Sequence, residues 1–358
     1  MNIGSRRISL GFERFSGLYL WALFIIVFGI WTPSLFLSQA TLHSVASQQA
    51  IGAILGLAVL VPLVAGAYDL SVGASVNLCA ILVSLLQSSH GWSMWPAIAC
   101  GVGAGVVIGA VNGFIVVKLR VNSFIATLGT TSVISAVQVM VTNNQQPFPA
   151  SGRIWSDLTQ LQIGGFQDVV IYLLVIAFLV WWMLEHTPVG RYLHAVGGNP
   201  EAARLSGVKV DRWTWLSLVM SGTICGIAGV LYASQSGPSL TFGSALMLPA
   251  FAAVFLGLTQ IKPGRFNVWG TMLAIYALAT GVKGLQLVTS DQWLNDLFNG
   301  VALIGAVSFA IWRQRRGASR RPSKPGADPA ERDDHASEEP LPGALEVASS
   351  AQFEEHAR

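Results

Sequence analysis

Charged side chains are scarce in this sequence. Only 11% of its 358 residues are Asp, Glu, Lys or Arg, whereas an average soluble domain carries about a quarter. Hydrophobic residues make up 53% of the chain, and the mean hydropathy is +0.56. This composition excludes an ordinary soluble domain and predicts an integral membrane protein.

Signatures of chemistry are also missing. The three cysteines, Cys79, Cys100 and Cys225, lie inside apolar runs without metal-like spacing, so neither a disulfide framework nor a metal site is indicated. The chain has no G-x-x-x-x-G-K-[ST] phosphate loop and no visible nucleophile–base arrangement. We therefore expect no enzyme activity, no cofactor on this chain and no nucleic-acid partner.

Apolar segments long enough to cross a bilayer occur ten times. They cover residues 17–37, 44–65, 70–88, 94–117, 122–141, 168–185, 213–234, 245–260, 266–287 and 294–312. The first segment follows several arginines but lacks a small-residue cleavage site, so it is read as a retained helix rather than a signal peptide. The sequence predicts an all-α integral membrane protein, a polytopic bundle of about ten transmembrane helices with one broken helix pair.

The positive charges predict the orientation of these helices. With the N-terminus in the cytoplasm, nearly all Lys and Arg residues fall on the cytoplasmic side, as the positive-inside rule requires; only Arg153 and Lys283 fall elsewhere. Both termini are therefore expected in the cytoplasm. The predicted division is a cytoplasmic N-terminus at 1–16, a transmembrane domain at 17–312 and a disordered cytoplasmic tail at 313–358, which is first basic and then acidic.

Asp69 is the only carboxylate well inside the apolar map, in the stretch AYDLSVG. An ionisable group at membrane depth is costly and is usually functional. Three roles are open. Asp69 caps a helix that begins at Leu70, lines a polar pathway at a broken helix, or relays protons.

Glycines recur at every fourth position of the segment 94–117, which leaves one helix face without side chains. Close packing against a neighbouring helix is expected there; the residues are Gly101, Gly105, Gly109 and Gly113, with a shorter pair at Gly222 and Gly226.

On the predicted outer side of the membrane, residues 142–167 form the largest loop. This loop could receive a soluble partner or cover the mouth of a pore.

The polar stretch from Glu185 to Trp213 carries a compact helix signal. Asn199 is suited to the N-cap, Pro200 to the first helical position, Glu201 to the first turn and Gly207 to the C-terminus. A helix this short is marginal by itself in water. It is either a stiff connector or a docking helix for another subunit.

Four stretches together resemble the ribose-type (monosaccharide) ABC transporter permeases, which are related to the branched-chain amino-acid ABC permeases. They are AYDLSVGASVNL, NGFIVVKLRVNSFIATLGT, GRYLHAVGGNPEAARLSGV and GRFNVWGTMLAI, and their order agrees over most of residues 50–310. The resemblance departs at residues 257–267, where many relatives have GGTSLSGGRGS and this chain has GLTQIKPGRFN. That departure leaves the identity of the sugar open.

The resemblance implies a multi-pass permease of a bacterial inner membrane. Such a permease imports a monosaccharide or sugar-like solute, works as a dimer with a second copy or a paralogue, and receives solute from a soluble binding protein outside. An ABC ATPase subunit binds the ATP. The loop 186–212 is then the coupling loop, with its expected contacts at Arg191, Asn199, Glu201, Ala202, Ala203, Arg204, Leu205 and Gly207.

Polar residues in apolar, family-like segments are the expected lining of the translocation pathway: Asp69, Ser71, Asn77, Asn112, Asn122 and Thr127. Three alternatives stay open at this point. They are a branched-chain amino-acid ABC permease, a proton-coupled secondary transporter that uses Asp69, and a structural or receptor-like membrane protein.

Overall fold

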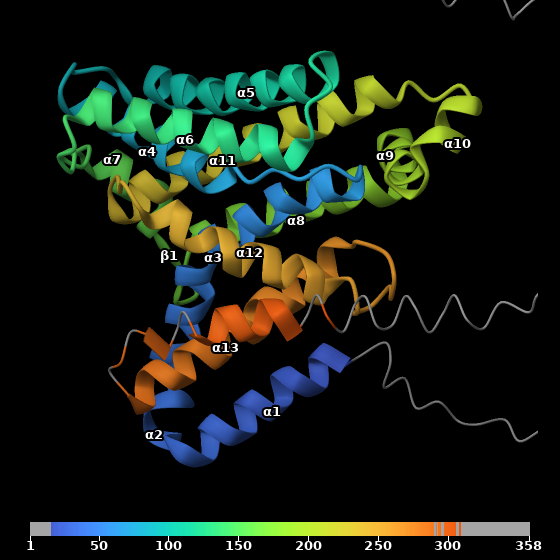
Figure 1. Cartoon of the computed structure of the whole chain (residues 1–358). Coiled ribbons are helices and arrows are strands. Elements are labelled where there is room, and N and C mark those ends of the chain that lie inside the picture. The colour runs from blue at the N-terminus through green and yellow to red at the C-terminus, as the bar shows by residue number, and fades with distance from the viewer. Residues whose placement is uncertain (1–15, 290, 292, 295–296, 306–307, 309–358) are drawn as a thin grey trace, which may run out of the picture. The chain divides into compact units, whose positions relative to one another are not determined.

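The computed structural model describes residues 16–289, 291, 293–294, 297–305 and 308. Helices make up nearly all of its regular structure (Figure 1). In chain order they are α1 Ser16–Trp31, α2 Pro33–Phe36, α3 Gln39–Val64, α4 Val72–Ser88, α5 Met94–Lys118, α6 Ser123–Thr142, α7 Arg153–Gln160, α8 Val169–His186, α9 Pro188–Gly198, α10 Pro200–Leu205, α11 Val210–Ser236, α12 Phe242–Gly257 and α13 Val268–Val288. Residues 297–305 are also helical, and β1 Gln162–Ile163 pairs antiparallel with β2 Phe166–Gln167.

The prediction of an all-α polytopic membrane protein is confirmed. Within the described residues, six helices are long and apolar enough to cross a membrane, namely α3, α5, α6, α8, α11 and α13. Three shorter apolar helices, α1, α4 and α12, lie on three further predicted segments. The tenth segment, 294–312, is described only in part. Residues 1–15 and 309–358, which carry most of the predicted N-terminal region and tail, lie outside the described residues.

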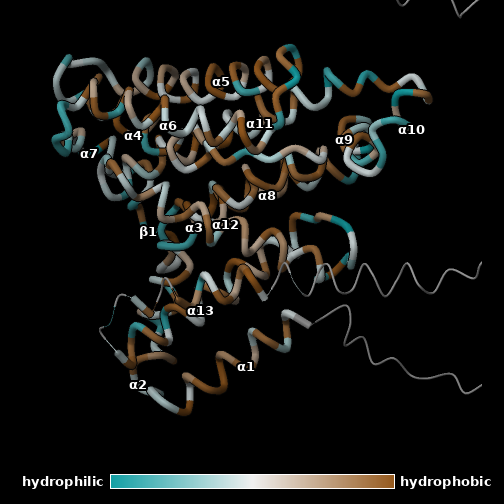
Figure 2. Tube along the Cα trace, viewed as in Figure 1, coloured by the Kyte–Doolittle hydropathy of each residue, from teal (hydrophilic) through white to brown (hydrophobic). Residues whose placement is uncertain are grey.

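Two long helices, α3 and α11, form the centre of the bundle. Most of the apolar stretch of each is buried inside the protein, 89% for α3 and 72% for α11, whereas α5, α6 and α8 bury less than a third. The polar connections gather at the two ends of the bundle, with α7 and the hairpin at one end and α9 and α10 at the other (Figure 2). The apolar sides of the bundle therefore face outward and its polar connections lie at the two ends, as a membrane-spanning protein requires.

The chain contains an internal repeat built on these two helices. Gly52, Gly56 and Gly73 each recur 170 residues later, as Gly222, Gly226 and Gly243. In each half a long helix is followed by a non-helical segment and then by a short helix, α3 by α4 and α11 by α12. The helix α3 packs on α12 and α13, and α11 packs correspondingly on α4 and α5.

The two halves are inverted relative to each other. The end of α3 at Gly66 lies against Gly197 of α9. The end of α11 at Gly237 lies against Pro149, in the connection that contains α7. The first turns of α4 and α12 meet in the middle. A Cβ on Gly73 would collide with the carbonyl of Gly243, and a Cβ on Gly243 with the carbonyl of Gly73. Inverted repeats joined through discontinuous helices are typical of membrane transporters.

The glycines of α5 lie where this helix crosses α11 and α4. A Cβ on Gly105 would collide with the carbonyl of Gly222, and one on Gly109 with the carbonyl of Leu218. At the two ends of the row, Gly101 faces the side chain of Val83 and Gly113 faces Trp215. The small residues thus let two helix backbones touch, which is how membrane helices gain packing energy without a hydrophobic driving force.

The segment treated as an outer loop contains regular structure. Residues 153–160 form α7, and the two strands follow directly. Buried and half-buried hydrogen bonds attach this segment to the end of α11: Thr159 pairs with the Ser234 hydroxyl at 2.9 Å, and the Gln235 amide donates to Gln167 Oε1 at 3.0 Å. Local sequence did not reveal α7, because much of its stability comes from these distant contacts.

We predict that Gly105→Leu strongly destabilises the protein while Gly103→Leu, the matched control, does not. Gly105 lies against the α11 backbone, whereas a Cβ on Gly103 meets nothing within 4 Å. Overpacking of a close interface costs about 1–3 kcal/mol. Thermal melting followed by size-exclusion chromatography in detergent measures the difference; equal melting of the two variants would contradict this account of the crossing.

Candidate functional site

The break between α3 and α4 is held by one face of α6. Ser123 Oγ accepts a hydrogen bond from the Tyr68 amide at 3.1 Å, and Thr127 Oγ1 accepts one from the Leu70 amide at 3.0 Å. Thr131 Oγ1 donates to the Leu70 carbonyl at 3.0 Å. These three side chains are spaced four residues apart and therefore lie on the same side of α6. They satisfy backbone groups that neither a helix nor lipid satisfies there.

Asp69 is at the centre of a buried polar cluster. Its Oδ1 accepts from the Ser71 amide at 3.0 Å and the Ser71 hydroxyl at 2.6 Å, and its Oδ2 accepts from the Ser221 hydroxyl of α11 at 2.8 Å. Asn112 of α5 donates through Nδ2 to Ser71 Oγ at 2.7 Å, and its Oδ1 has no partner within the described residues. All four side chains are almost fully buried. The cluster joins the start of α4 to α5 and α11.

The arrangement resembles the predicted capping role, with one difference. The helix begins at Val72 rather than at Leu70, and the carboxylate reaches the amide of Ser71, which precedes the first helical residue. The amide of Leu70 is instead paired with Thr127. Asp69 thus stabilises the turn that leads into α4.

Four of the six expected pathway residues lie together around this break: Asp69, Ser71, Asn112 and Thr127. Asn77 lies elsewhere, where its Oδ1 accepts from the Gly243 amide at 2.7 Å and its Nδ2 donates to the Leu240 carbonyl at 3.0 Å, which secures the start of α12. Asn122 is exposed and caps α6 through the Phe124 amide at 2.9 Å. Their role in a pathway stays a prediction.

The predicted site set lacked Ser221, Thr131 and Gln138. Gln138 donates to the Ala74 carbonyl at 2.8 Å, so it extends the contact of α6 with α4. The four-residue spacing of Ser123, Thr127 and Thr131 was a usable sequence signal for this face. Ser221 carried no such signal, because its partner lies 152 residues away.

The short helix in the polar connection forms as the sequence predicts. Asn199 Oδ1 accepts from the amides of Glu201 and Ala202 at 3.1 and 3.0 Å. At the other end Gly207 has a φ of +81°, and the amides of Gly207 and Val208 donate to the carbonyls of Arg204 and Ala203 at 3.0 Å. This is a Schellman motif, in which a glycine adopts the left-handed conformation. Both ends of α10 are therefore satisfied locally.

Side chains of α10 point away from the bundle. Only Ala203 is buried, at 5% exposure, whereas Leu205 is 90% exposed. Figure 1 shows α10 protruding at its end of the bundle. Leu205 is the one large apolar side chain of this well-capped helix, and it is open to contact from outside the bundle.

A second helix in this connection, α9, was not expected from the sequence. It is anchored through buried Leu193 and Val196, and through Tyr192, which stacks on Trp213 with a ring-centroid distance of 4.8 Å. Gly197, near its end, packs directly on the backbone of Val64 and Gly66. Arg191 lies exposed on the same helix. The helix α9 therefore connects α10 to the break that contains Asp69.

The segment 257–267, which departs from the family pattern, contacts the end of α8, next to α9. Lys262 forms an ion pair with Glu185 at 2.6 Å, and Glu185 is only 14% exposed. Burial lowers the pKa of His194 on α9, and the positive charge of Arg265 lowers it further. The hydrogen bond from Nδ1 to the Gly190 carbonyl, at 2.8 Å, opposes this lowering of the pKa in part.

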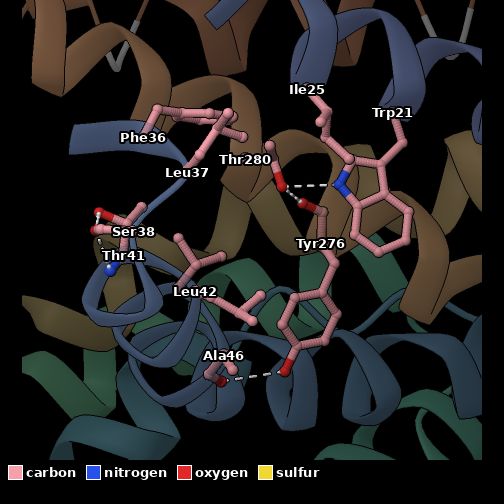
Figure 3. Close-up of a pocket in the computed structure, with 11 residues that line it drawn as sticks. Trp21, Ile25, Phe36, Leu37, Ser38, Thr41, Leu42, Ala46, Tyr276 and Thr280 are labelled. Carbon is pink, nitrogen blue, oxygen red and sulfur yellow. Dashed lines mark hydrogen bonds between the residues drawn. The ribbon is translucent and has the colours of Figure 1, made fainter. Parts of the chain in front are cut away.

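The cavities that the described residues form include two between the membrane helices. The larger, about 370 Å³, lies between α1, α3 and α13 and is mostly apolar (Figure 3). Polar groups on its wall are already paired, Trp21 Nε1 with Thr280 Oγ1 at 2.8 Å and the Tyr276 hydroxyl with the Ala46 carbonyl at 3.2 Å. The smaller, about 230 Å³, lies between α3, α12, α13 and the helical segment 297–305. None of the six expected pathway residues lines either cavity.

Comparison with known proteins places the chain in a family. The model of the family described as "Branched-chain amino acid transport system / permease component" matches residues 41–307. The chain is 30% identical over 296 residues to the fructose import permease protein FrcC of Rhizobium meliloti, which covers 80% of this chain and 82% of the relative.

Two further relatives are autoinducer 2 import system permease proteins named LsrC. The one from Enterobacter sp. (strain 638) is 31% identical over 81% of this chain and 86% of its own. The one from Klebsiella pneumoniae subsp. pneumoniae is 31% identical over 80% of this chain and 82% of its own. No solved structure matches the chain.

We predict that Asp69→Ala destabilises the protein more than Asp69→Asn. Alanine leaves three buried donors without their acceptor, at about 1–3 kcal/mol each, whereas asparagine keeps one oxygen acceptor. Melting in detergent ranks the two variants. If both melt like the unchanged protein, the carboxylate does not stabilise the turn before α4.

Proposed function

The chain belongs to the family of branched-chain amino acid transport system permease components, and from this premise we propose that it is the membrane-spanning subunit of an ABC importer for a sugar or sugar-like solute. ATP would be bound and hydrolysed on a separate ATPase subunit, and this chain would bind no cofactor. The observation that carries the proposal is the similarity over four-fifths of the chain to permeases named for fructose and autoinducer 2 import.

The protein is a multi-pass protein of the inner membrane, and its proposed topology has ten membrane helices with both termini in the cytoplasm. Two contacts support one common cytoplasmic end. Gly197 of α9 packs on the end of α3, and Lys262 pairs with Glu185 at the end of α8. Positive residues cluster in these connections, in agreement with the positive-inside rule.

We propose that α10 is the coupling helix. It is capped at both ends, largely exposed and joined to α9 through the single extended residue Asn199, so a push on this short helix would be passed on to α9. The contact of Gly197 with Val64 and Gly66 would pass that movement to the break between α3 and α4. There the hydrogen bonds of Asp69 and of the α6 hydroxyls would be the interactions that shift as access changes from one side to the other.

Other partners follow from the importer assignment. A second permease copy or a paralogue would complete the pathway within the bilayer. A soluble binding protein would dock at the opposite end, where α7 and the hairpin are firmly attached to α11 and α3. The name of the family favours a second candidate solute class, branched-chain amino acids.

We predict ATP-dependent uptake of a monosaccharide and not of leucine. Cells that carry the importer, and cells lacking this chain, are tested with radiolabelled fructose, ribose and leucine. Uptake of a sugar that is lost on removal of this chain and of its co-purified ATPase supports the proposal. Leucine uptake would move the assignment to the amino-acid class. Sugar uptake that survives removal of the ATPase, but stops when the proton gradient is dissipated, would move it to secondary transport.

We also predict that Leu205→Glu uncouples transport without unfolding the protein. The side chain is 90% exposed, so a charge there leaves the bundle intact but opposes an apolar contact with the ATPase. Uptake and recovery of the ATPase on purification should both fall about tenfold or more, as loss of an interface anchor commonly does. Leu119→Glu is the control, because Leu119 is a 60% exposed leucine at the end of α5, outside both α10 and the segment of α7 and the hairpin. Normal uptake with Leu205→Glu would exclude α10 as the docking helix.

A further inference from the structure

The smaller cavity differs from the larger one in its chemistry. Three carboxamide side chains, Gln49, Gln286 and Asn299, line it among aliphatic residues. Within the described residues, these amides form no hydrogen bond with the protein, and no charged side chain lines the cavity. Each amide offers both donors and an acceptor, so the set matches hydroxyl groups, which also donate and accept.

A backbone acceptor adds to the three amides. Pro249 lies inside α12 and has no N–H to donate to the carbonyl of Ala245, four residues before it. Both Ala245 and Pro249 line the cavity. The Ala245 carbonyl thus lacks its helical partner next to a space that holds polar side chains.

The internal repeat shows that these groups occur at only one of two related helix crossings. At the equivalent positions, 170 residues away, Gln49 corresponds to Val219 and Pro249 to Cys79. Where α11 crosses α5, the two backbones touch at Gly105. At the repeat-related crossing of α3 with α13, Gly56 faces the side chains of Ile275 and Thr271 instead. The first crossing is therefore closed, and the second leaves a polar cavity beside it.

The position of the cavity suits entry from outside. Gln286 lies two residues before the end of α13, and Gln49 lies ten residues, or about 15 Å, from the start of α3. The start of α3 adjoins the hairpin, where His43 contacts Phe166 with a ring-centroid distance of 4.5 Å. In the proposed topology this end faces outward.

We propose that the cavity bounded by Gln49, Gln286, Asn299 and the Ala245 carbonyl holds the incoming solute, an uncharged polyhydroxylated molecule no larger than a single sugar ring. The volume of about 230 Å³ lies below the roughly 300–1,000 Å³ of pockets for drug-sized ligands. A free amino acid carries two charges, which this lining leaves without partners. The site rests on the proposed import function and narrows its substrate class.

Transport of radiolabelled fructose and ribose tests the site in the complete importer. The variants are Gln49→Leu, Gln286→Leu and Asn299→Leu, each of which removes hydrogen bonding at similar volume. Gln48→Leu is the matched control, because Gln48 is exposed beside Gln49 and does not line the cavity. We expect each lining variant to slow uptake about threefold to tenfold, the effect of one lost hydrogen bond, and the control to transport normally.

Cysteine labelling supplies a readout that does not depend on transport. In a chain whose three cysteines are replaced by alanine, Gln286→Cys and Asn299→Cys should react with a membrane-impermeant methanethiosulfonate reagent added outside. Val219→Cys, at the repeat position of Gln49, should not react. Fructose or ribose in excess should slow the reaction at both cavity positions, and leucine should not.

The outcomes separate the site from the function. If the unchanged importer takes up sugar while all three lining variants match Gln48→Leu and both cavity cysteines stay unlabelled, the site is wrong and the import function stands. Protection by leucine instead of sugar would overturn the substrate class. If the unchanged protein imports no sugar, the proposed function fails and the assignment of this site fails with it.

Discussion

Backbone hydrogen bonding inside an apolar solvent is the constraint on which this structure depends. Lipid offers no partner to a free N–H or C=O group, so every interruption of a helix must be compensated by the protein itself. The segment between α3 and α4 meets this condition through hydroxyls of α6 at Tyr68 and Leu70, and through the Asp69 cluster at the start of α4. Because the compensating groups come from α5, α6 and α11, the break also orients those helices around it.

The repeat explains how one scaffold supports both a closed and an open helix crossing. Small residues at Gly105 and Gly222 let α5 and α11 interlock, so these two helices behave as a single packed unit. The related crossing of α3 with α13 replaces the backbone contact by side chains and leaves space next to α12. Gly73 and Gly243 hold the two short helices start to start without room for a side chain. A movement of one short helix would therefore displace the other directly.

Membership of the permease family defines the class of transporter. The identity of the transported solute depends on residues that differ from one member to the next. The family name refers to amino acids, whereas similar permeases are named for the import of fructose and autoinducer 2. The departure at residues 257–267 illustrates such a difference. Lys262 in this segment pairs with Glu185 at the end of α8, so the segment contacts the end of the bundle that carries α9 and α10 rather than the cavity nearer the other end.

Much of the architecture was predictable because it follows from local properties. Apolar segments predicted the membrane helices closely, and the Asn199, Pro200 and Gly207 signals predicted α10, since caps act on neighbouring backbone groups. The helices α7 and α9 were missed because they are stabilised by contacts with α11 and α3 rather than by their own sequences.

The sequence by itself determined the membrane class, the family, the short capped helix and the glycine face of α5. Only the tertiary structure decided what the polar residues inside the membrane contact. It brought Asp69, Ser71, Asn112 and Thr127 together, sent Asn77 to α12, and placed Gln49 beside Gln286 and Asn299. The physical reason is that a buried polar group takes its partner from whichever helix packs beside it, and that neighbour lies far away in the chain.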